Sequence, residues 1–189
     1  MTNVAEKREQ VTSSLLEKAG KYLTFALGKE EYGLEILKVR EIIGYVDITA
    51  VPQTPHYVKG VINLRGQVIP VIELRAKFGL PSTEVTDQTC VIVVEVASGN
   101  RTYSKGLIVD NVEEVLDIAG ENIEETPQFG SNIDTEFILG MGKVGDAVKI
   151  LLDIDKVLAN DDLTGIPGFA ANEIVAENIE KQPKKSEKD

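Results

Sequence analysis

The segment GVINLRGQVIPVIEL at 60–74 has the pattern of a β-hairpin. Two apolar runs flank the pair Arg65-Gly66, and a glycine placed between apolar runs is typical of a tight turn. Pro70 lies inside the second run. Because proline has no backbone N–H to donate, the second strand is predicted to be an edge strand or to carry a bulge at Pro70. In a small closed barrel, this position marks where strand pairing stops.

A second segment repeats this design. GMGKVGDAVKILLDI at 140–154 aligns with 60–74 without gaps at an offset of 80 residues, and the alignment pairs Gly60 with Gly140. A helical stretch follows both segments. The identity between them is low, so the order of the elements is the stronger sign of a repeat.

The segments upstream of the two hairpins are also alike. VREIIGYVDITAVP at 39–52 is echoed by VEEVLDIAGENIEETP at 112–127, and each reads as an amphipathic strand, a turn and a proline. The whole order of strand, proline, glycine, hairpin, acidic residue and helix therefore occurs twice. We interpret the chain as two similar small β-barrels, each too small to be stable alone, that pack together.

Strand signals dominate between the polar ends of the chain, which predicts a mainly β protein. Short helices fit best at 34–38 and 74–79. Many short strands separated by Gly, Asn, Asp and Ser turns favour barrels or sandwiches over a βαβ fold. The predicted strands are 22–27, 39–45, 61–63, 67–74, 89–96, 104–110, 112–118 and 147–154.

The composition is that of a globular protein, with 42% hydrophobic and 27% charged residues among 189. No apolar stretch approaches the roughly 20 residues of a membrane span, and the charges of MTNVAEKREQ fall where a signal peptide is apolar. We therefore expect a cytoplasmic protein. Cys90 is the only cysteine and lies in TCVIVVEV, so it is expected to be a buried core thiol.

Acidic residues are concentrated in one part of the chain. The net charge is −11, and residues 110–162 contain fourteen Asp and Glu against three Lys. Binding to a phosphate backbone depends on Lys and Arg, so nucleic acid is not an expected partner. The acidic part is interpreted as a solvated surface, with selection of partners by charge as the alternative.

The sequence contains no recognisable catalytic pattern, metal site or cofactor loop. His56 is the only histidine and lies in PQTPHY, a loop expected to be exposed. One histidine and one cysteine do not make a tetrahedral zinc site, and no G-x-S-x-G or Walker-type glycine loop is present. We expect neither an enzyme nor a cofactor.

Alternation in VREII suggests a recognition surface. It places Val39, Glu41 and Ile43 on one strand face, and Arg40 and Ile42 on the other. One face must fill the barrel, yet the other still carries an apolar residue. Such a second apolar face either binds a partner or is buried where the two barrels meet, and the pattern supports both equally.

The strand VEEVL shows the same feature in the second copy. Val112 and Val115 are three residues apart, so strict alternation places them on opposite faces. Both copies are thus expected to carry apolar side chains on each face of this strand.

Three longer segments resemble the CheW family of bacterial chemotaxis adaptors. They are EEYGLEILKVREIIGY at 30–45, TPHYVKGVINLRGQVIPVIELRAKFGL at 54–80 and GLIVDNVEEVL at 106–116. The resemblance runs in order from about Tyr22 to Leu158. The chain lacks the phosphotransfer and ATP-binding regions of the related kinase CheA, and it is too short to add the receiver domain of CheV. A stand-alone adaptor fits best.

The resemblance implies two intertwined five-stranded SH3-like barrels with short helices. It implies a CheW-like domain at 21–160, between a polar segment at 1–20 and a polar tail at 161–189 that is expected to be disordered. It also implies a non-enzymatic adaptor that joins the tips of methyl-accepting chemotaxis proteins to CheA, at receptor arrays on the inner face of the membrane. The alternative is a small-ligand-binding β-barrel sensor, which needs an internal cavity with polar lining.

The resemblance further implies which residues meet the receptor. Valines would contact apolar side chains of the receptor helices, and glycines would permit close approach. Arg65 would donate to a receptor carboxylate or carbonyl, oriented by Glu41. Gly145 stands opposite Arg65 in the second copy, so the arginine is not duplicated. Residues that contact the kinase are not assigned. The implied receptor-binding set is Val39, Glu41, Gly60, Arg65, Val112, Val115 and Gly140.

Overall fold

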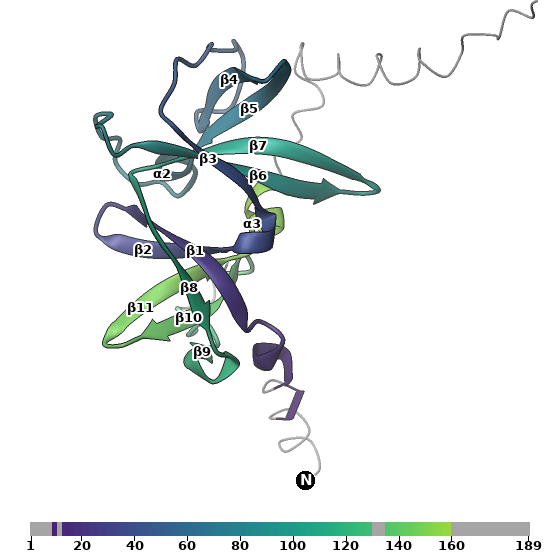
Figure 1. The fold of residues 1–189 in the computed structure, drawn as a ribbon, viewed down its shortest axis with the longest axis vertical. Coiled ribbons are helices and arrows are strands. Elements are labelled where there is room, and N and C mark those ends of the chain that lie inside the picture. The colour runs from purple at the N-terminus through teal and green to yellow at the C-terminus, as the bar shows by residue number, and fades with distance from the viewer. Residues whose placement is uncertain (1–8, 11–12, 130–134, 160–189) are drawn as a thin grey trace, which may run out of the picture. The chain divides into compact units, whose positions relative to one another are not determined.

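The computed structural model describes residues 9–10, 13–129 and 135–159 and is mainly β (Figure 1). Its short helices include the 3-10 turns η1 (Ile36–Lys38) and η2 (Gly120–Asn122) and the α-helices α2 (Leu74–Lys77) and α3 (Ile154–Leu158), besides a helical turn at 13–16. The strands are β1 (Gly20–Leu27), β2 (Glu30–Glu35), β3 (Val39–Gly44), β4 (Val58–Leu64), β5 (Gln67–Glu73), β6 (Cys90–Ser98), β7 (Arg101–Val109), β8 (Asn111–Ile118), β9 (Ile123–Glu124), β10 (Ile138–Val144) and β11 (Ala147–Leu152).

The strands form two sheets that pack together, which confirms the prediction of a mainly β fold. Sheet A has six strands in the order β8-β1-β2-β11-β10-β9, and sheet B has five in the order β3-β6-β7-β5-β4. Sheet A thus has one strand more than expected, the two-residue β9. Each sheet contains one parallel pair, β2 with β11 and β5 with β7, among antiparallel neighbours.

The predicted repeat is visible in the topology. Repeat I runs from β1 to α2, and repeat II runs from β6 to α3. The hairpin β1–β2 of repeat I lies in sheet A, between β8 and β11 of repeat II. The hairpin β6–β7 of repeat II lies in sheet B, between β3 and β5 of repeat I. The two repeats have therefore exchanged their first hairpins within one chain, and this exchange makes the sheets intertwined.

Each sheet has its own apolar cluster. In sheet B, Val91 and Val93 of β6 pack in a cluster with residues such as Ile69 and Val71. The intervening Ile92 and Val94 are fully buried as well, so both faces of β6 are covered. A strand buried on both faces reads as a continuous apolar run, which explains TCVIVVEV. Sheet A has a second cluster built around Tyr22, Ile118, Ile123 and Leu151.

Two longer strands, β2 and β10, are absent from the predicted strand segments. Both contain glycine, which weakens the strand signal. At Gly33 a Cβ atom would lie 2.8 Å from a methyl carbon of Leu151, so glycine allows this side chain to pack closely against β2. The helix predicted at 34–38 is only the 3-10 turn η1, because β2 continues to Glu35.

Two predictions about single residues need correction. Pro70 is not on an edge strand, because β5 lies between β4 and β7. Nor does it carry a bulge, since the register shift in this pair falls between Val58 and Gly60. Pairing with β7 does begin at Val71, directly after the proline. Cys90 is only half-buried at the start of β6, where its thiol donates to the carbonyl of Gln88.

Part of the polar N-terminal segment packs against sheet A. Leu15 contacts the Tyr22 cluster, and the Lys18 ammonium donates to the carbonyl of Leu139 at 2.6 Å. The tail predicted at 161–189 lies outside the described residues. Within the described part of the chain, no helix is long and apolar enough to cross a membrane.

Candidate functional site

Arg65 stands at the tip of the β4–β5 hairpin in an unusual backbone conformation. The two turn residues Arg65 and Gly66 have φ angles of 52° and 86°, and the Asn63 side chain accepts a hydrogen bond from the Gly66 N–H at 2.8 Å. A left-handed conformation costs an L-residue such as arginine about 1–2 kcal/mol. In repeat II the same turn position is Gly145, with φ 60°, where the conformation carries no such cost.

The guanidinium of Arg65 is held by Glu41 of β3. Nη1 and Nη2 donate to the two carboxylate oxygens of Glu41 at 2.6 and 2.9 Å, a bidentate pair. The hydrogen bonds and charge of Glu41 raise the pKa of Arg65. The Arg65 side chain is nonetheless 76% exposed, whereas that of Glu41 is 18% exposed. Glu41 thus fixes the direction of a guanidinium whose remaining surface faces solvent.

A bulge in β3 places Val39 on the face opposite to Glu41, contrary to the simple alternation. Val39 pairs with Val94 and Glu41 pairs with Val93, so the register shifts by one residue between them. Val93 belongs to the core cluster of sheet B, and the Glu41 face is therefore the cluster face. Val39 shares the face opposite to the cluster with Ile42, which is 43% exposed at this end strand of the sheet.

A matching bulge in β8 also corrects the prediction for Val112 and Val115. Val112 pairs with Phe25 and Val115 pairs with Leu23, so two residues of β8 stand opposite Thr24. Leu23 and Phe25 share one face of β1, and the two valines consequently share one face of β8. Val115 is 48% exposed.

The two bulges give β3 of repeat I and β8 of repeat II equivalent apolar faces. Val39 and Ile42 in repeat I correspond to Val112 and Val115 in repeat II, each pair flanking a bulge. Ile42 is absent from the predicted set, although the structure gives it the same place beside a bulge as Val115. The available signal was the shared three-residue spacing of the apolar side chains in VREII and VEEVL.

Gly60 and Gly140 are required by the fold itself. Both are buried, and both lie at a register shift between paired strands. A Cβ atom on Gly60 would lie 2.1 Å from the carbonyl oxygen of Thr49, and one on Gly140 would lie 2.9 Å from that of Glu124. The close approach at these glycines is therefore made by the chain's own backbone.

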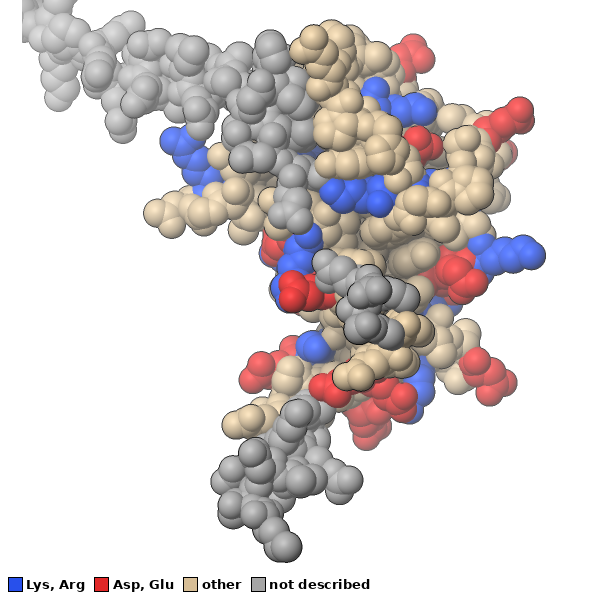
Figure 2. Space-filling view, turned by 180° about the vertical axis from the view of Figure 1, so that it is seen from behind, with Lys and Arg blue, Asp and Glu red and all other residues tan. Residues whose placement is uncertain are grey.

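The seven predicted residues thus fall into two groups on two sheets. Glu41 and Arg65 contact each other directly, and Gly60 lies in the hairpin that carries Arg65. Val112 and Val115 lie together on β8 of sheet A. Figure 2 shows Asp and Glu side chains around the lower part of the molecule, where Figure 1 places β8 to β11.

The residues that could carry chemistry are dispersed. Among the described residues, no three His, Cys, Asp or Glu side chains are grouped as metal ligands. His56 is exposed as expected, with Nε2 lying 3.2 Å from the carbonyl oxygen of Ala76. Both core clusters consist of Val, Ile, Leu and Tyr, unlike the polar-lined cavity that a small-ligand sensor needs.

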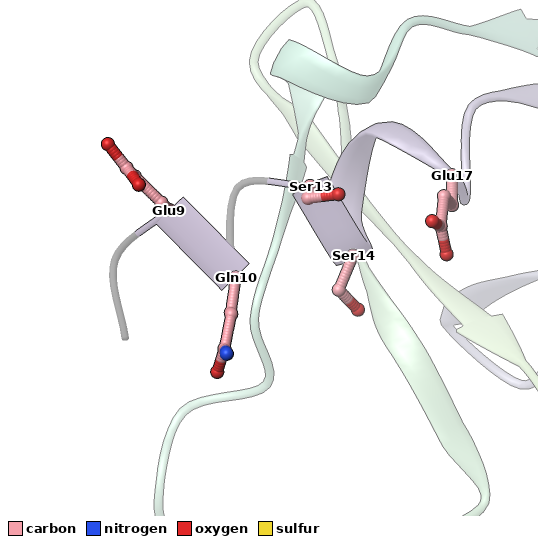
Figure 3. A pocket seen from close by; sticks show the side chains of 5 residues that line it. All are labelled: Glu9, Gln10, Ser13, Ser14 and Glu17. Carbon is pink, nitrogen blue, oxygen red and sulfur yellow. The ribbon is translucent and has the colours of Figure 1, made fainter. Parts of the chain in front are cut away.

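One surface hollow lies along the N-terminal segment. Figure 3 shows that its polar side chains spread along this segment and do not converge on a common point. All of them are exposed, so the hollow lacks the buried polar groups of a specific ligand site. Its lining residues are Glu9, Gln10, Ser13, Ser14 and Glu17.

Comparison with known proteins gives one consistent family. The model of the CheW-like domain matches residues 21–162. The chain is 40% identical to the chemotaxis protein CheW of Klebsiella aerogenes, over 79% of this chain and 87% of that protein. It is 33% identical to the probable chemotaxis protein CheW of Rhizobium etli, over 74% and 88%. The crystal structure of the scaffolding protein TtCheW from Thermoanaerobacter tengcongensis matches with a TM-score of 0.66 and 37% identity, covering 74% of this chain and 92% of that one.

Proposed function

The chain belongs to the CheW family, and from this premise we propose that it is a non-enzymatic adaptor coupling methyl-accepting chemoreceptors to the histidine kinase CheA. It acts inside the cell at receptor arrays, through a CheW-like domain at 21–160. It transmits signals by binding differently to the states of its partners, which shifts the kinase between activity levels without chemistry of its own.

The observation that supports the receptor contact is the backbone conformation and the side-chain orientation of Arg65. This residue occupies a left-handed turn position where repeat II has a glycine, and it is held outward by a bidentate contact with Glu41. Backbone strain at an exposed, oriented side chain is a mark of a functional position. We assign the exposed guanidinium to a carboxylate or carbonyl oxygen of the receptor's helical tip.

Apolar contacts come from the equivalent faces of β3 and β8 that carry the side chains beside each bulge. Val39 and Val112 belong to the predicted set, and we add Ile42 as the counterpart of Val115. The exposed members Ile42 and Val115 offer branched apolar side chains to a receptor helix. Gly60 and Gly140 act indirectly, because they permit the close backbone contacts with Thr49 and Glu124 that hold the β4–β5 and β10–β11 hairpins in place.

A pull-down with a receptor signalling fragment and with CheA tests this function. We expect wild-type protein to capture each partner, and Arg65→Glu to weaken receptor capture by roughly tenfold or more, as for a charge reversal at an interface. Lys29→Glu is the matched control, since Lys29 is exposed in the turn between β1 and β2 and lies outside the predicted receptor-binding set. Undiminished receptor capture by folded Arg65→Glu would remove the assignment of Arg65. Capture of neither partner by wild-type protein would reject the adaptor function.

A further inference from the structure

Two ion pairs connect the repeats at the points where the exchanged hairpins end. Lys38, in η1 after the repeat I hairpin, donates to Asp155 of α3 at 2.5 Å. Asp110, directly after the repeat II hairpin, accepts from Nε and Nη2 of Arg75 in α2 at 2.7 and 2.5 Å. The Arg75 and Asp110 side chains are only 14% and 23% exposed, and those of the other pair are 32% exposed.

The two ion pairs are equivalent in the repeat but opposite in polarity. Arg75 and Asp155 are related by the same offset of 80 residues that relates the hairpins, and each lies in the helix that ends its repeat. Lys38 and Asp110 each occupy the connection between an exchanged hairpin and the next strand. In one pair the connection is basic and the helix is acidic, and in the other pair the signs are reversed.

The reversal of charge signs favours the observed hairpin exchange over the alternative in which each hairpin joins the sheet of its own repeat. Both hairpins have the same form, so each could in principle complete the sheet of its own repeat. The connection would then leave the sheet beside the helix of the same repeat. Lys38 would face Arg75, and Asp110 would face Asp155, which places like charges together in half-buried positions.

A hairpin that completes the sheet of its own repeat type must come from a second copy of the chain, at least in the case of repeat II. Only Asp110 separates β7 from β8, so these strands are at most about 7.6 Å apart where they connect. If the repeat II hairpin completed its own sheet, β6 would lie between β7 and β8, and the two strands would be about 9.6 Å apart. The competing assembly is therefore an intermolecular exchange, which yields dimers or larger species.

We propose that the opposite polarity of the Lys38–Asp155 and Arg75–Asp110 pairs directs each hairpin to the other repeat and prevents two copies of the chain from exchanging hairpins between like repeats. Each aspartate also accepts a backbone N–H, from Gly28 at Asp110 and from Ala97 at Asp155, which holds the carboxylates in place.

Reversal of the pairs one at a time and together tests this proposal. Arg75→Asp with Asp110→Arg keeps an ion pair at each connection but gives both pairs the same polarity. Lys38→Asp with Asp155→Lys does the same independently, so failure of one variant to fold leaves the other. The fourfold variant restores opposite polarity. Each protein is refolded from urea at several concentrations, checked by circular dichroism and sized by light scattering after gel filtration.

We expect wild-type protein and the fourfold variant to refold as monomers. In each twofold variant, the ratio of dimers and larger species to monomer should rise roughly tenfold, the change that corresponds to about 1.4 kcal/mol of lost discrimination. A purely stabilising role predicts another order, because the fourfold variant loses both backbone acceptors and would refold worst. The proposal would be overturned if the fourfold variant refolded worst of all. It would also be overturned if the twofold variants were as monomeric as the wild type.

Discussion

The hydroxyl of Thr24 in β1 makes two hydrogen bonds with the backbone of Glu114 in β8. It donates to the Glu114 carbonyl at 2.9 Å and accepts from the Glu114 N–H at 3.2 Å. Thr24 is 1% exposed and stands opposite the two bulged residues of β8. A bulge leaves backbone groups without ladder partners. One buried threonine satisfies them here, and in doing so sets the face on which Val115 lies.

Thr24→Val should destabilise the fold and weaken receptor binding together. The valine keeps the shape of the side chain but leaves a backbone donor and acceptor at the bulge without their partner, at a cost of about 1–3 kcal/mol. Loss of the bulge would also turn Val115 toward the other face. Urea denaturation measures the first effect, and the receptor pull-down measures the second.

Thr24→Ser is the control, because serine keeps the hydroxyl. We expect its receptor binding to match that of the wild type, with a small loss of stability from the missing methyl group. If Thr24→Val were as stable as Thr24→Ser, the hydroxyl would not hold the bulge.

Ile42→Ala and Val115→Ala should weaken receptor binding by similar amounts. The two side chains are equivalent in the repeat and are 43% and 48% exposed. Loss of their apolar contact should cost about 1 kcal/mol each, or roughly fivefold in affinity. Val85→Ala is the control, since Val85 is 54% exposed in the loop between α2 and β6 and belongs to neither strand. Unchanged binding by Ile42→Ala would exclude Ile42 from the receptor surface.

Gly60→Ala should be far more destabilising than Gly145→Ala. Both glycines have positive φ angles, but only at Gly60 would a Cβ atom collide with backbone, at Thr49. We expect a loss of about 2–4 kcal/mol at Gly60 from strain and overpacking, against about 1 kcal/mol at Gly145. Urea denaturation of both variants measures these losses in the free energy of unfolding. Equal losses would show that strands β4 and β5 adjust around the new methyl group.

The sequence predicted the repeat and the fold class because both depend on order and composition. The continuous run in β6 and the Arg65-Gly66 turn are strong local signals. The bulges in β3 and β8 were missed, because strict alternation was assumed and because the residue that holds the β8 bulge, Thr24, lies far away in the chain. The exchange of hairpins followed only from family resemblance, since a single sequence does not show which sheet a strand joins. Contacts such as Arg75 with Asp110 depend on that exchange.

The pair formed by Arg75 and Asp110 should make stability depend on acidic pH. The hydrogen bonds from Arg75 are the main cause that lowers the pKa of Asp110 below its ordinary value, with a further contribution from the Gly28 N–H. A carboxyl whose pKa is lower in the folded state stabilises the fold above its unfolded pKa of about 4, and this stabilisation is lost as pH falls through the folded pKa.

Asp110→Asn should therefore be less stable than the wild type at pH 7, with a difference that shrinks as pH falls below 4. The asparagine oxygen can still accept the Gly28 N–H, so the change removes mainly the charge opposite Arg75. Urea denaturation at pH 7, 5 and 3 follows the difference. Asp117→Asn, at an exposed position of β8, controls for the loss of one negative charge. A difference between Asp110→Asn and the wild type that stays constant over this range would contradict a lowered pKa, because only a titrating carboxylate loses its stabilising contact with Arg75 in acid.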